Sequence, residues 1–368
     1  MNVYFPEIKR NFGFGFMRLP KDGEQVDIAQ TIKMVDAFMA AGFNYFDTAH
    51  GYISEQSEII LRQTLTSRYP REAYILTNKL SPSYFEKNAD IRPIFQVQRD
   101  ACGVDYFDFY LMHAQNSELF AKYKACRAYE TALELKAEGK IRHLGISFHD
   151  KAEVLDQILT EYPQIEVVQI QFNYLDFESP RVESRKCYEV CRKHNKPVIV
   201  MEPVRGGQLV NLPTAAVDIL PRLGGGSNAS YAIRFAAGFE GICMVLSGMS
   251  SLEMVEENCA FMTDFQPLNE KELSAVQEVA EVINSLDLIP CTSCKYCVDG
   301  CPQSIRIPEL FTIRNKKRRY SENQAEETYA AMEVKASACV ECGQCEDVCP
   351  QQLPIRQLLK TVAEEFEK

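Results

Sequence analysis

The segment FNYFDT, residues 43–48, is a short apolar run that ends in two polar residues. Amphipathic stretches with helical spacing lie between runs of this kind, and two of them, residues 27–42 and 118–139, end at a glycine, as helices often do. Seven further apolar runs lie on either side of the quoted one: FGFGFMRL (12–19), AYILTN (73–78), FDFYLM (107–112), RHLGIS (142–147), VVQIQF (167–172), PVIVM (197–201) and GICMVLS (241–247).

Continuous apolar strands that alternate with helices are typical of a parallel sheet with both faces covered. Eight such units predict the α/β fold class and a (β/α)8 TIM barrel. The competing fold is a doubly wound sheet, which carries G-x-G-x-x-G after its first strand. Residues 13–18, GFGFMR, supply only G-x-G. Residues 266–290 predict one more helix and a short tether, so we expect the barrel domain to cover residues 1–285.

Two near copies of one cysteine pattern follow: CTSCKYCVDGCP at 291–302 and CVECGQCEDVCP at 339–350. Both read C-x2-C-x2-C-x3-C-P. In this pattern three thiolates wrap one iron–sulfur cube, and the cysteine before proline ligates the other cube. The repeat therefore predicts two [4Fe-4S] clusters. Their ligands are Cys291, Cys294, Cys297 and Cys349 for one cluster, and Cys339, Cys342, Cys345 and Cys301 for the other.

Zinc and disulfides are the alternatives for these cysteines. Structural zinc sites usually combine two separated knuckles of two ligands each, which fits this spacing poorly. Disulfides need an oxidising compartment, and the opening residues MNVYFPEIKR lack the apolar core of a signal peptide. Residues 303–338 show no period-2 alternation, so we expect an α-helical ferredoxin-like domain over residues 286–368.

The composition narrows the class of protein. The chain has 368 residues, 46% hydrophobic content and a net charge of −11, which argues against general nucleic-acid binding. No apolar run approaches the ~20 residues of a membrane span. We expect a cytoplasmic protein with no membrane partner. Its other six cysteines are expected to be reduced thiols in the core: Cys102, Cys126, Cys187, Cys191, Cys243 and Cys259.

Four polar residues stand at the ends of predicted strands, which is where barrel enzymes carry their active sites. Asp47 ends the second predicted strand and Tyr52 follows it in FDTAHGY. Lys79 follows the third predicted strand, and His113 follows the fourth. Taken singly, each is more often a structural residue. Together they predict a proton-transfer site, because a nearby ammonium favours the phenolate of a tyrosine and lowers its pKa.

In this set of residues the chain resembles the aldo-keto reductase family over roughly residues 10–265, and FDTAHGY keeps the family pattern D-T-A-x-x-Y. The cysteine-rich tail resembles a subgroup with ferredoxin-type domains. The resemblance implies a nicotinamide-dependent oxidoreductase acting on a small carbonyl or alcohol. Tyr52 would donate the proton, and Lys79 would lower the pKa of Tyr52. Asp47 would hold Lys79 in place, and His113 would orient the carbonyl oxygen.

The same resemblance implies a binding site for NADP or NAD. Ser147 and Gln169 match positions that hold the nicotinamide amide, and Gly15, Arg18 and Leu19 line the mouth of the first strand. Pro203, Gly206 and Gly207 match positions along the pyrophosphate. The adenosine end matches Ser247, Gly248, Met249, Glu257 and Asn258.

This sequence departs from the family pattern at four positions. Phe148 replaces an asparagine, and Met201 replaces the tyrosine found under the nicotinamide ring. Gly248 and Met254 stand where many members carry basic residues for the 2′-phosphate, which normally needs arginine or lysine. The departures leave the choice between NADP and NAD open.

Three functions fit the whole chain. The first is a nicotinamide-dependent carbonyl/alcohol oxidoreductase with structural or relaying clusters. The second is a redox protein whose clusters exchange electrons with a ferredoxin-like partner, and the third is a non-catalytic iron–sulfur module, against which the intact tetrad argues. The basic segment RNKKRRY, 314–320, is either a solvated helix face or a docking patch for an acidic carrier such as ferredoxin.

Overall fold

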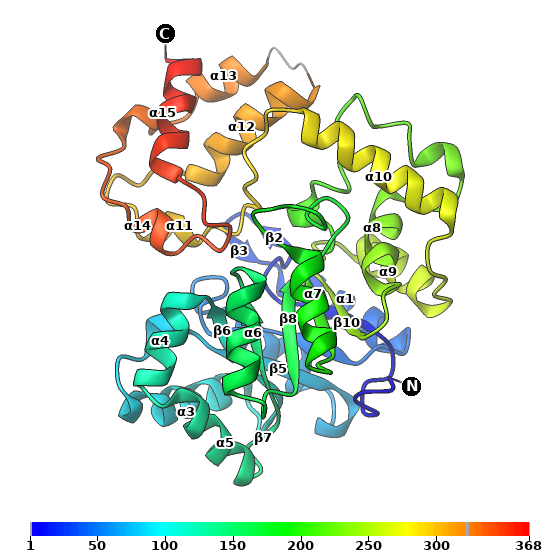
Figure 1. Cartoon of the computed structure of the whole chain (residues 1–368), viewed down its shortest axis with the longest axis vertical. Helices are drawn as coiled ribbons and strands as arrows, with labels where there is room; N and C mark the ends of the chain where they lie inside the picture. The colour runs from blue at the N-terminus through cyan, green and yellow to red at the C-terminus, as the bar shows by residue number, and fades with distance from the viewer. Residues whose placement is uncertain (1, 321–323, 368) are drawn as a thin grey trace. The chain divides into compact units, whose positions relative to one another are not determined.

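The computed structural model describes residues 2–320 and 324–367 (Figure 1). They form two compact units. The barrel unit comprises Met1–Pro203 and Ile233–Leu268, and the helical unit comprises Val204–Ala232 and Asn269–Lys368. The predicted domain boundary at residue 285 stays a prediction, because the two units divide the chain along a different line.

The barrel unit holds a closed sheet in the order β1-β10-β9-β8-β7-β6-β5-β4, with every neighbouring pair parallel. All eight predicted strands are present, and the predicted (β/α)8 barrel is confirmed. The strands are β1 Phe12–Gly15, β4 Tyr45–Asp47, β5 Ile75–Leu80, β6 Phe107–Gln115, β7 Ile141–Phe148, β8 Val167–Gln171, β9 Val198–Met201 and β10 Ile242–Ser247. A hairpin of two short strands, β2 Lys21–Asp22 and β3 Gln25–Val26, was not predicted.

Close packing inside the barrel explains why β1 contains a glycine. A Cβ atom on Gly13 would lie 2.7 Å from the side chain of Leu246 and 2.9 Å from that of Tyr45, so a larger residue would force these neighbours to move. The N-terminal segment adds Phe5 to the same core, where its ring lies 4.9 Å edge-on from Phe109. The register pairs Gly15 of β1 with Asp47 of β4, which sets both residues at the carboxyl ends of their strands.

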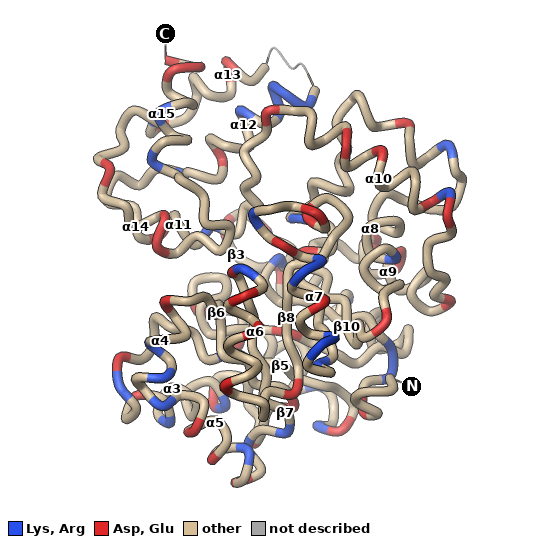
Figure 2. The backbone as a smooth tube through the Cα atoms, in the orientation of Figure 1, with Lys and Arg blue, Asp and Glu red and all other residues tan. Residues whose placement is uncertain are grey.

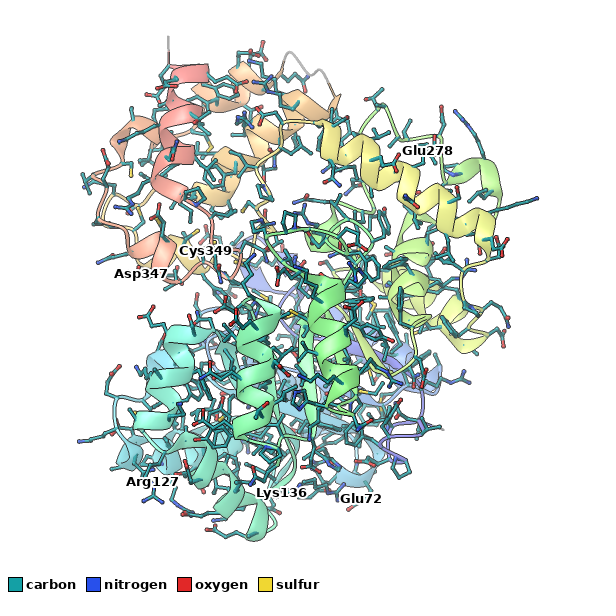
Figure 3. The ribbon with its side chains drawn as sticks, viewed as in Figure 1. Glu72, Arg127, Lys136, Glu278, Asp347 and Cys349 are labelled. Carbon is teal, nitrogen blue, oxygen red and sulfur yellow. The ribbon has the colours of Figure 1, made fainter. Side chains whose placement is uncertain are left out.

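Helices cover the barrel from outside. They are α1 Ile28–Ala40, α2 Ser57–Leu61, α3 Asn88–Cys102, α4 Ser117–Ala125, α5 Ala128–Ala137, α6 Ala152–Glu161, α7 Ser184–Lys193, α8 Asn228–Ala237 and α9 Leu252–Thr263. A π-helical turn, Arg62–Thr66, continues α2. The single helix expected over residues 118–139 is wrong. Arg127, labelled in Figure 3, has a left-handed backbone with φ of 55° and separates α4 from α5.

The helical unit has no strand in the part of the chain that the structure describes, which confirms the predicted α-helical ferredoxin-like architecture. Leu310, Phe311, Tyr329, Leu359 and Val362 form its core. Its helices are α10 Glu270–Ser285, α11 Tyr296–Asp299, α12 Ile307–Tyr320, α13 Gln324–Ala330, α14 Gln344–Asp347 and α15 Ile355–Phe366. Residues 303–338, which we expected to be helical, include α12 and α13, and residues 321–323 between them lie outside the described residues.

The helical unit also contains the segment that follows β9. The side chain of Gln208 donates a hydrogen bond to the Cys291 carbonyl at 2.6 Å. A Cβ atom on Gly206 would lie 2.5 Å from the Thr292 carbonyl oxygen, so the two backbones touch. Buried Arg319 of α12 donates to the Gln208 carbonyl at 2.8 Å and to the Asn211 carbonyl. Residues 204–211 are therefore fixed directly on the first cysteine loop.

Candidate active site and iron–sulfur sites

The predicted tetrad comes together at the carboxyl ends of β4, β5 and β6. Lys79 Nζ lies 2.6 Å from Asp47 Oδ1 and 3.2 Å from the Tyr52 hydroxyl, and it also donates to the Thr48 carbonyl at 2.9 Å. Asp47 and Lys79 are buried. Burial raises the pKa of Asp47 and lowers that of Lys79, while their mutual ion pair opposes both shifts.

His113 completes the tetrad. Its ring lies 6.0 Å edge-on from the Tyr52 ring, and its Nδ1 is 2.7 Å from the Ser81 hydroxyl. Burial, followed by the positive charge of Lys79, holds the pKa of His113 well below its usual value, so the imidazole is neutral near neutral pH. When Ser81 donates to Nδ1, the proton sits on Nε2 and is available to a carbonyl oxygen.

Two of the predicted nicotinamide contacts are neighbours in the sheet. Ser147 of β7 pairs with Gln169 of β8, and both side chains are buried. The Ala114 backbone N–H donates to the Ser147 hydroxyl at 2.8 Å, with Ala114 in a left-handed conformation of φ 58°. Non-glycine residues adopt this conformation mainly where the surroundings enforce it, often at functional sites.

Arg18 occupies the space that a side chain at position 248 would need. A Cβ atom on Gly248 would lie 3.1 Å from the Cβ of Arg18, and the Ser250 hydroxyl donates to the Arg18 carbonyl at 2.8 Å. The Arg18 guanidinium lies 3.6 Å from the Glu202 carboxylate, just after β9. Sequence reasoning missed Glu202, although an acid directly after a strand end was a usable signal.

The remaining predicted cofactor residues are spread over both units. Leu19, Ser247, Met249 and Asn258 are buried in the barrel unit, whereas Glu257 is exposed. Pro203 follows β9 in the barrel unit, while Gly206 and Gly207 belong to the helical unit with φ of 60° and 89°. Their roles as cofactor contacts stay predictions.

A second buried network supports the loop that carries Tyr52, and sequence reasoning missed it. His50 Nδ1 lies 2.7 Å from Glu58 Oε2, and Asn78 donates to Glu58 Oε1 at 2.7 Å. Glu58 is fully buried, and its hydrogen bond raises the pKa of His50. The three residues that follow Tyr52, residues 53–55, all have positive φ. This short loop therefore stores backbone strain beside the tetrad.

The eight loop cysteines line two cavities. One cavity is lined by Cys291, Cys294, Cys297 and Cys349, and the other by Cys301, Cys339, Cys342 and Cys345. This grouping is the crossed one that the repeat predicts; Figure 3 labels Cys349 beside Asp347. Among the described residues, no group of three or more His, Cys, Asp or Glu side chains lies close enough to hold a single metal ion. Sulfurs set around a cavity suit a four-iron cube better than one zinc ion.

Backbone amides already point at two of the sulfurs. The Ser293 N–H donates to Cys291 Sγ and the Ile305 N–H donates to Cys301 Sγ, both at 3.4 Å. Hydrogen bonds to cluster sulfurs help to set the reduction potential of a bound cluster. The two loops therefore supply the ligands and the polar surroundings that an iron–sulfur cluster needs.

Part of the basic segment on α12 is turned inward, while Lys316 and Arg318 are exposed, so a docking role for the segment stays a prediction. Arg314 is buried and pairs with Asp287 and Glu365, while buried Arg319 binds backbone carbonyls of the helical unit. Lys317 and Arg318 also pair with Glu365. Two of the five basic residues are therefore buried, and the other three lie at least partly at the surface.

Comparison with known proteins shows which family the barrel resembles. Residues 11–281 match the model of the aldo/keto reductase family. The chain belongs to this family. Residues 290–353 match the model of the 4Fe-4S dicluster domain, so this family member carries an iron–sulfur domain behind its barrel, as predicted. In the described residues no helix has the length and apolar character to cross a membrane.

Relatives of this family member are distant. It is 29% identical over 206 residues to the NADH-specific methylglyoxal reductase of Escherichia coli, covering 51% of this chain and 59% of that enzyme's length. It is 25% identical over 295 residues to L-galactose dehydrogenase of Arabidopsis thaliana, covering 74% of this chain and 91% of that protein. A Klebsiella pneumoniae aldo-keto reductase, solved with NADPH, has a TM-score of 0.61 at 21% identity and covers 73% of this chain and 90% of its own; this likeness shows the fold.

Proposed function

We propose that the chain catalyses nicotinamide-dependent interconversion of a small aldehyde or ketone and its alcohol. The observation that carries this proposal is Lys79 Nζ, held 2.6 Å from Asp47 and 3.2 Å from the Tyr52 hydroxyl. A bound nicotinamide supplies the hydride for the carbonyl carbon. Tyr52 donates the proton to the carbonyl oxygen, and the neutral His113 orients that oxygen through Nε2.

The cofactor proposal rests on residues of the barrel unit. Ser147 and Gln169 would hold the nicotinamide amide, and Arg18 would supply a positive charge for the phosphates. Gly248 and exposed Met254 offer no cation to a 2′-phosphate. We therefore expect little discrimination in favour of NADPH over NADH. The E. coli relative described as NADH-specific is consistent with this expectation.

The clusters are proposed to be two [4Fe-4S] centres, each held by one of the two sets of four cysteines. We propose that these clusters carry single electrons. The second candidate function, electron exchange between the clusters and a ferredoxin-like partner, is therefore kept. The dicluster match favours that second candidate as an added activity. Loss of visible cluster absorbance on addition of NADH would show that electrons from the nicotinamide reach the clusters.

The test uses holoprotein purified without oxygen. Oxidation of NADH and NADPH is followed against aldehydes, ketones and sugars, with Tyr52→Phe as the critical variant. We expect its kcat to fall about 10²-fold or more, the scale of a lost general acid, with cofactor affinity unchanged. Tyr69→Phe, which removes a hydroxyl bonded to Asp36, is the matched control. Near-normal turnover in Tyr52→Phe would overturn the proposed function.

A further inference from the structure

The two cysteine loops are copies in sequence but differ in exposure. Thr292 and Val340 occupy the same position, directly after the first cysteine of each loop. The polar Thr292 is 3% exposed, whereas the apolar Val340 is 58% exposed. Cys342 is also exposed, although Cys294, its counterpart, is partly covered. At this position the polar side chain is buried and the apolar one is exposed, which is the reverse of the usual distribution.

The first loop is covered by the chain itself. Gly206 lies against the Thr292 carbonyl, and the Gln208 side chain binds the Cys291 carbonyl at 2.6 Å. In the second loop, Arg356 and Lys360 of α15 contact acidic side chains. No side chain binds a backbone carbonyl of this loop as Gln208 binds that of Cys291, within the described part of the helical unit. The first cysteine loop is thus covered by residues 204–211, whereas the second, which we call the open loop, is not covered by a segment of this kind. The contacts of residues 204–211 show how a polypeptide segment can pack on such a loop.

The open loop carries two exposed apolar side chains. Val340 and Val348, 58% and 46% exposed, stand on either side of the exposed Cys342 in the sequence. Two exposed valines within one short acidic loop offer apolar surface for contact with another protein. Here they flank a cysteine that lines the second cavity. We call Val340, Cys342 and Val348 the open-loop face.

The charges around the open-loop face select the partner. The loop carries Glu341, Glu346 and Asp347 and no basic residue, and α14 accordingly includes acidic residues in Figure 2. Glu341 pairs with Lys360 at 2.9 Å, and Glu346 pairs with Arg356 at 2.7 Å. The three acids outnumber these two cations on a chain of net charge −11. An acidic carrier is repelled by this rim, and a basic one is attracted.

We propose that the open-loop face is the docking surface for a one-electron carrier protein whose contact face has an apolar centre and a basic rim. The inference rests on the proposed two-cluster function. In the transfer, the reduced cluster that Cys301, Cys339, Cys342 and Cys345 would hold would give up one electron, and the oxidised centre of the carrier would gain it. No bond or proton is exchanged, so the step balances.

The test measures electron transfer from dithionite-reduced holoprotein by stopped flow. Cytochrome c serves as the basic one-electron acceptor and flavodoxin as the acidic carrier. We expect faster transfer to cytochrome c, with a rate that falls as salt rises. The double variant Val340→Ser/Val348→Ser should slow it about tenfold through lost apolar contact. Val217→Ser removes another exposed valine of the helical unit, 44% exposed, and should leave the rate unchanged.

Iron content and visible absorbance establish that each variant keeps its clusters. If the valine variant loses iron, Asp347→Lys on the exposed end of α14 replaces it and should slow transfer to cytochrome c. Equal rates in wild type and variants, or a preference for flavodoxin, overturn the proposal. A dimer that Val340→Ser dissociates overturns it too, because a second copy then covers the face. Nicotinamide-dependent carbonyl reduction, measured separately, reports on the proposed function alone.

Discussion

At the scale of single residues, Arg18 and Glu202 lead to a prediction about cofactor affinity. Glu202 lies 3.6 Å from the Arg18 guanidinium and would compete for it with the cofactor phosphate that we propose Arg18 holds. We expect Glu202→Gln to tighten NADH binding about three- to tenfold, and Arg18→Gln to weaken it by a similar factor, as for one charged hydrogen bond. Titration of NADH fluorescence measures both. If the two variants shift affinity in the same direction, Arg18 does not hold the phosphate.

His50 predicts a pH effect on stability. Its hydrogen bond to Glu58 raises the pKa of His50 in the folded chain above the unfolded value of about 6.5. The folded state therefore holds this proton more tightly. The resulting stability is full below pH 6.5 and is lost as the pH rises through the folded-state value. His50→Gln keeps a donor for Glu58 but cannot titrate, so its unfolding free energy should depend less on pH above 6.5.

Urea unfolding of wild type and His50→Gln from pH 5.5 to 9 measures this difference. His194→Gln is a control, because His194 pairs with Asp156, which is distant in sequence from this loop. A parallel pH dependence for His50→Gln and wild type would show that the ion pair with Glu58 does not matter. Glu58 was not predicted, because its partners depend on tertiary contacts, whereas Glu202 was missed although it directly follows a strand. The tetrad was predicted because its members stand at or just after the ends of three successive strands.

At the scale of elements, the two loops exchange their fourth cysteines. Cys349 belongs to the second loop in sequence but lines the cavity of the first. Cys349→Ser should therefore remove the cluster of the first loop and lower iron from about eight to about four atoms per chain. Iron analysis with electron paramagnetic resonance identifies the lost cluster. Cys126→Ser, at a buried thiol outside the loops, should keep all the iron.

The strands were predictable and one helix break was not, for reasons that lie in the chain. Each strand is an apolar run bounded by polar residues, a pattern that one sequence displays directly. Arg127 interrupts residues 118–139 although the helical spacing of apolar residues continues through it. Glycine, which favours a left-handed backbone, is absent at this break, so the local sequence carries no signal for it.

At the scale of the whole molecule, the two compact units are not continuous in the sequence. Residues 204–232 interrupt the barrel sequence yet belong to the helical unit. The hydrogen bond from Gln208 to Cys291 joins residues 83 positions apart, and the contact of Arg319 with Gln208 spans 111. Local patterns cannot reveal such pairs, so the predicted boundary at residue 285 divided the chain by sequence alone.

The bond between Gln208 and the Cys291 backbone has a consequence for how the protein matures. Residues 204–211 leave the ribosome before the cysteines that hold them, and metal ligation and folding are coupled in small metal-binding domains. Chains made under iron starvation should therefore complete the barrel and leave this segment unpinned. Limited proteolysis should cut iron-free protein within residues 204–227 and spare the iron-loaded form. The supply of iron would then decide which newly made chains survive cellular proteases.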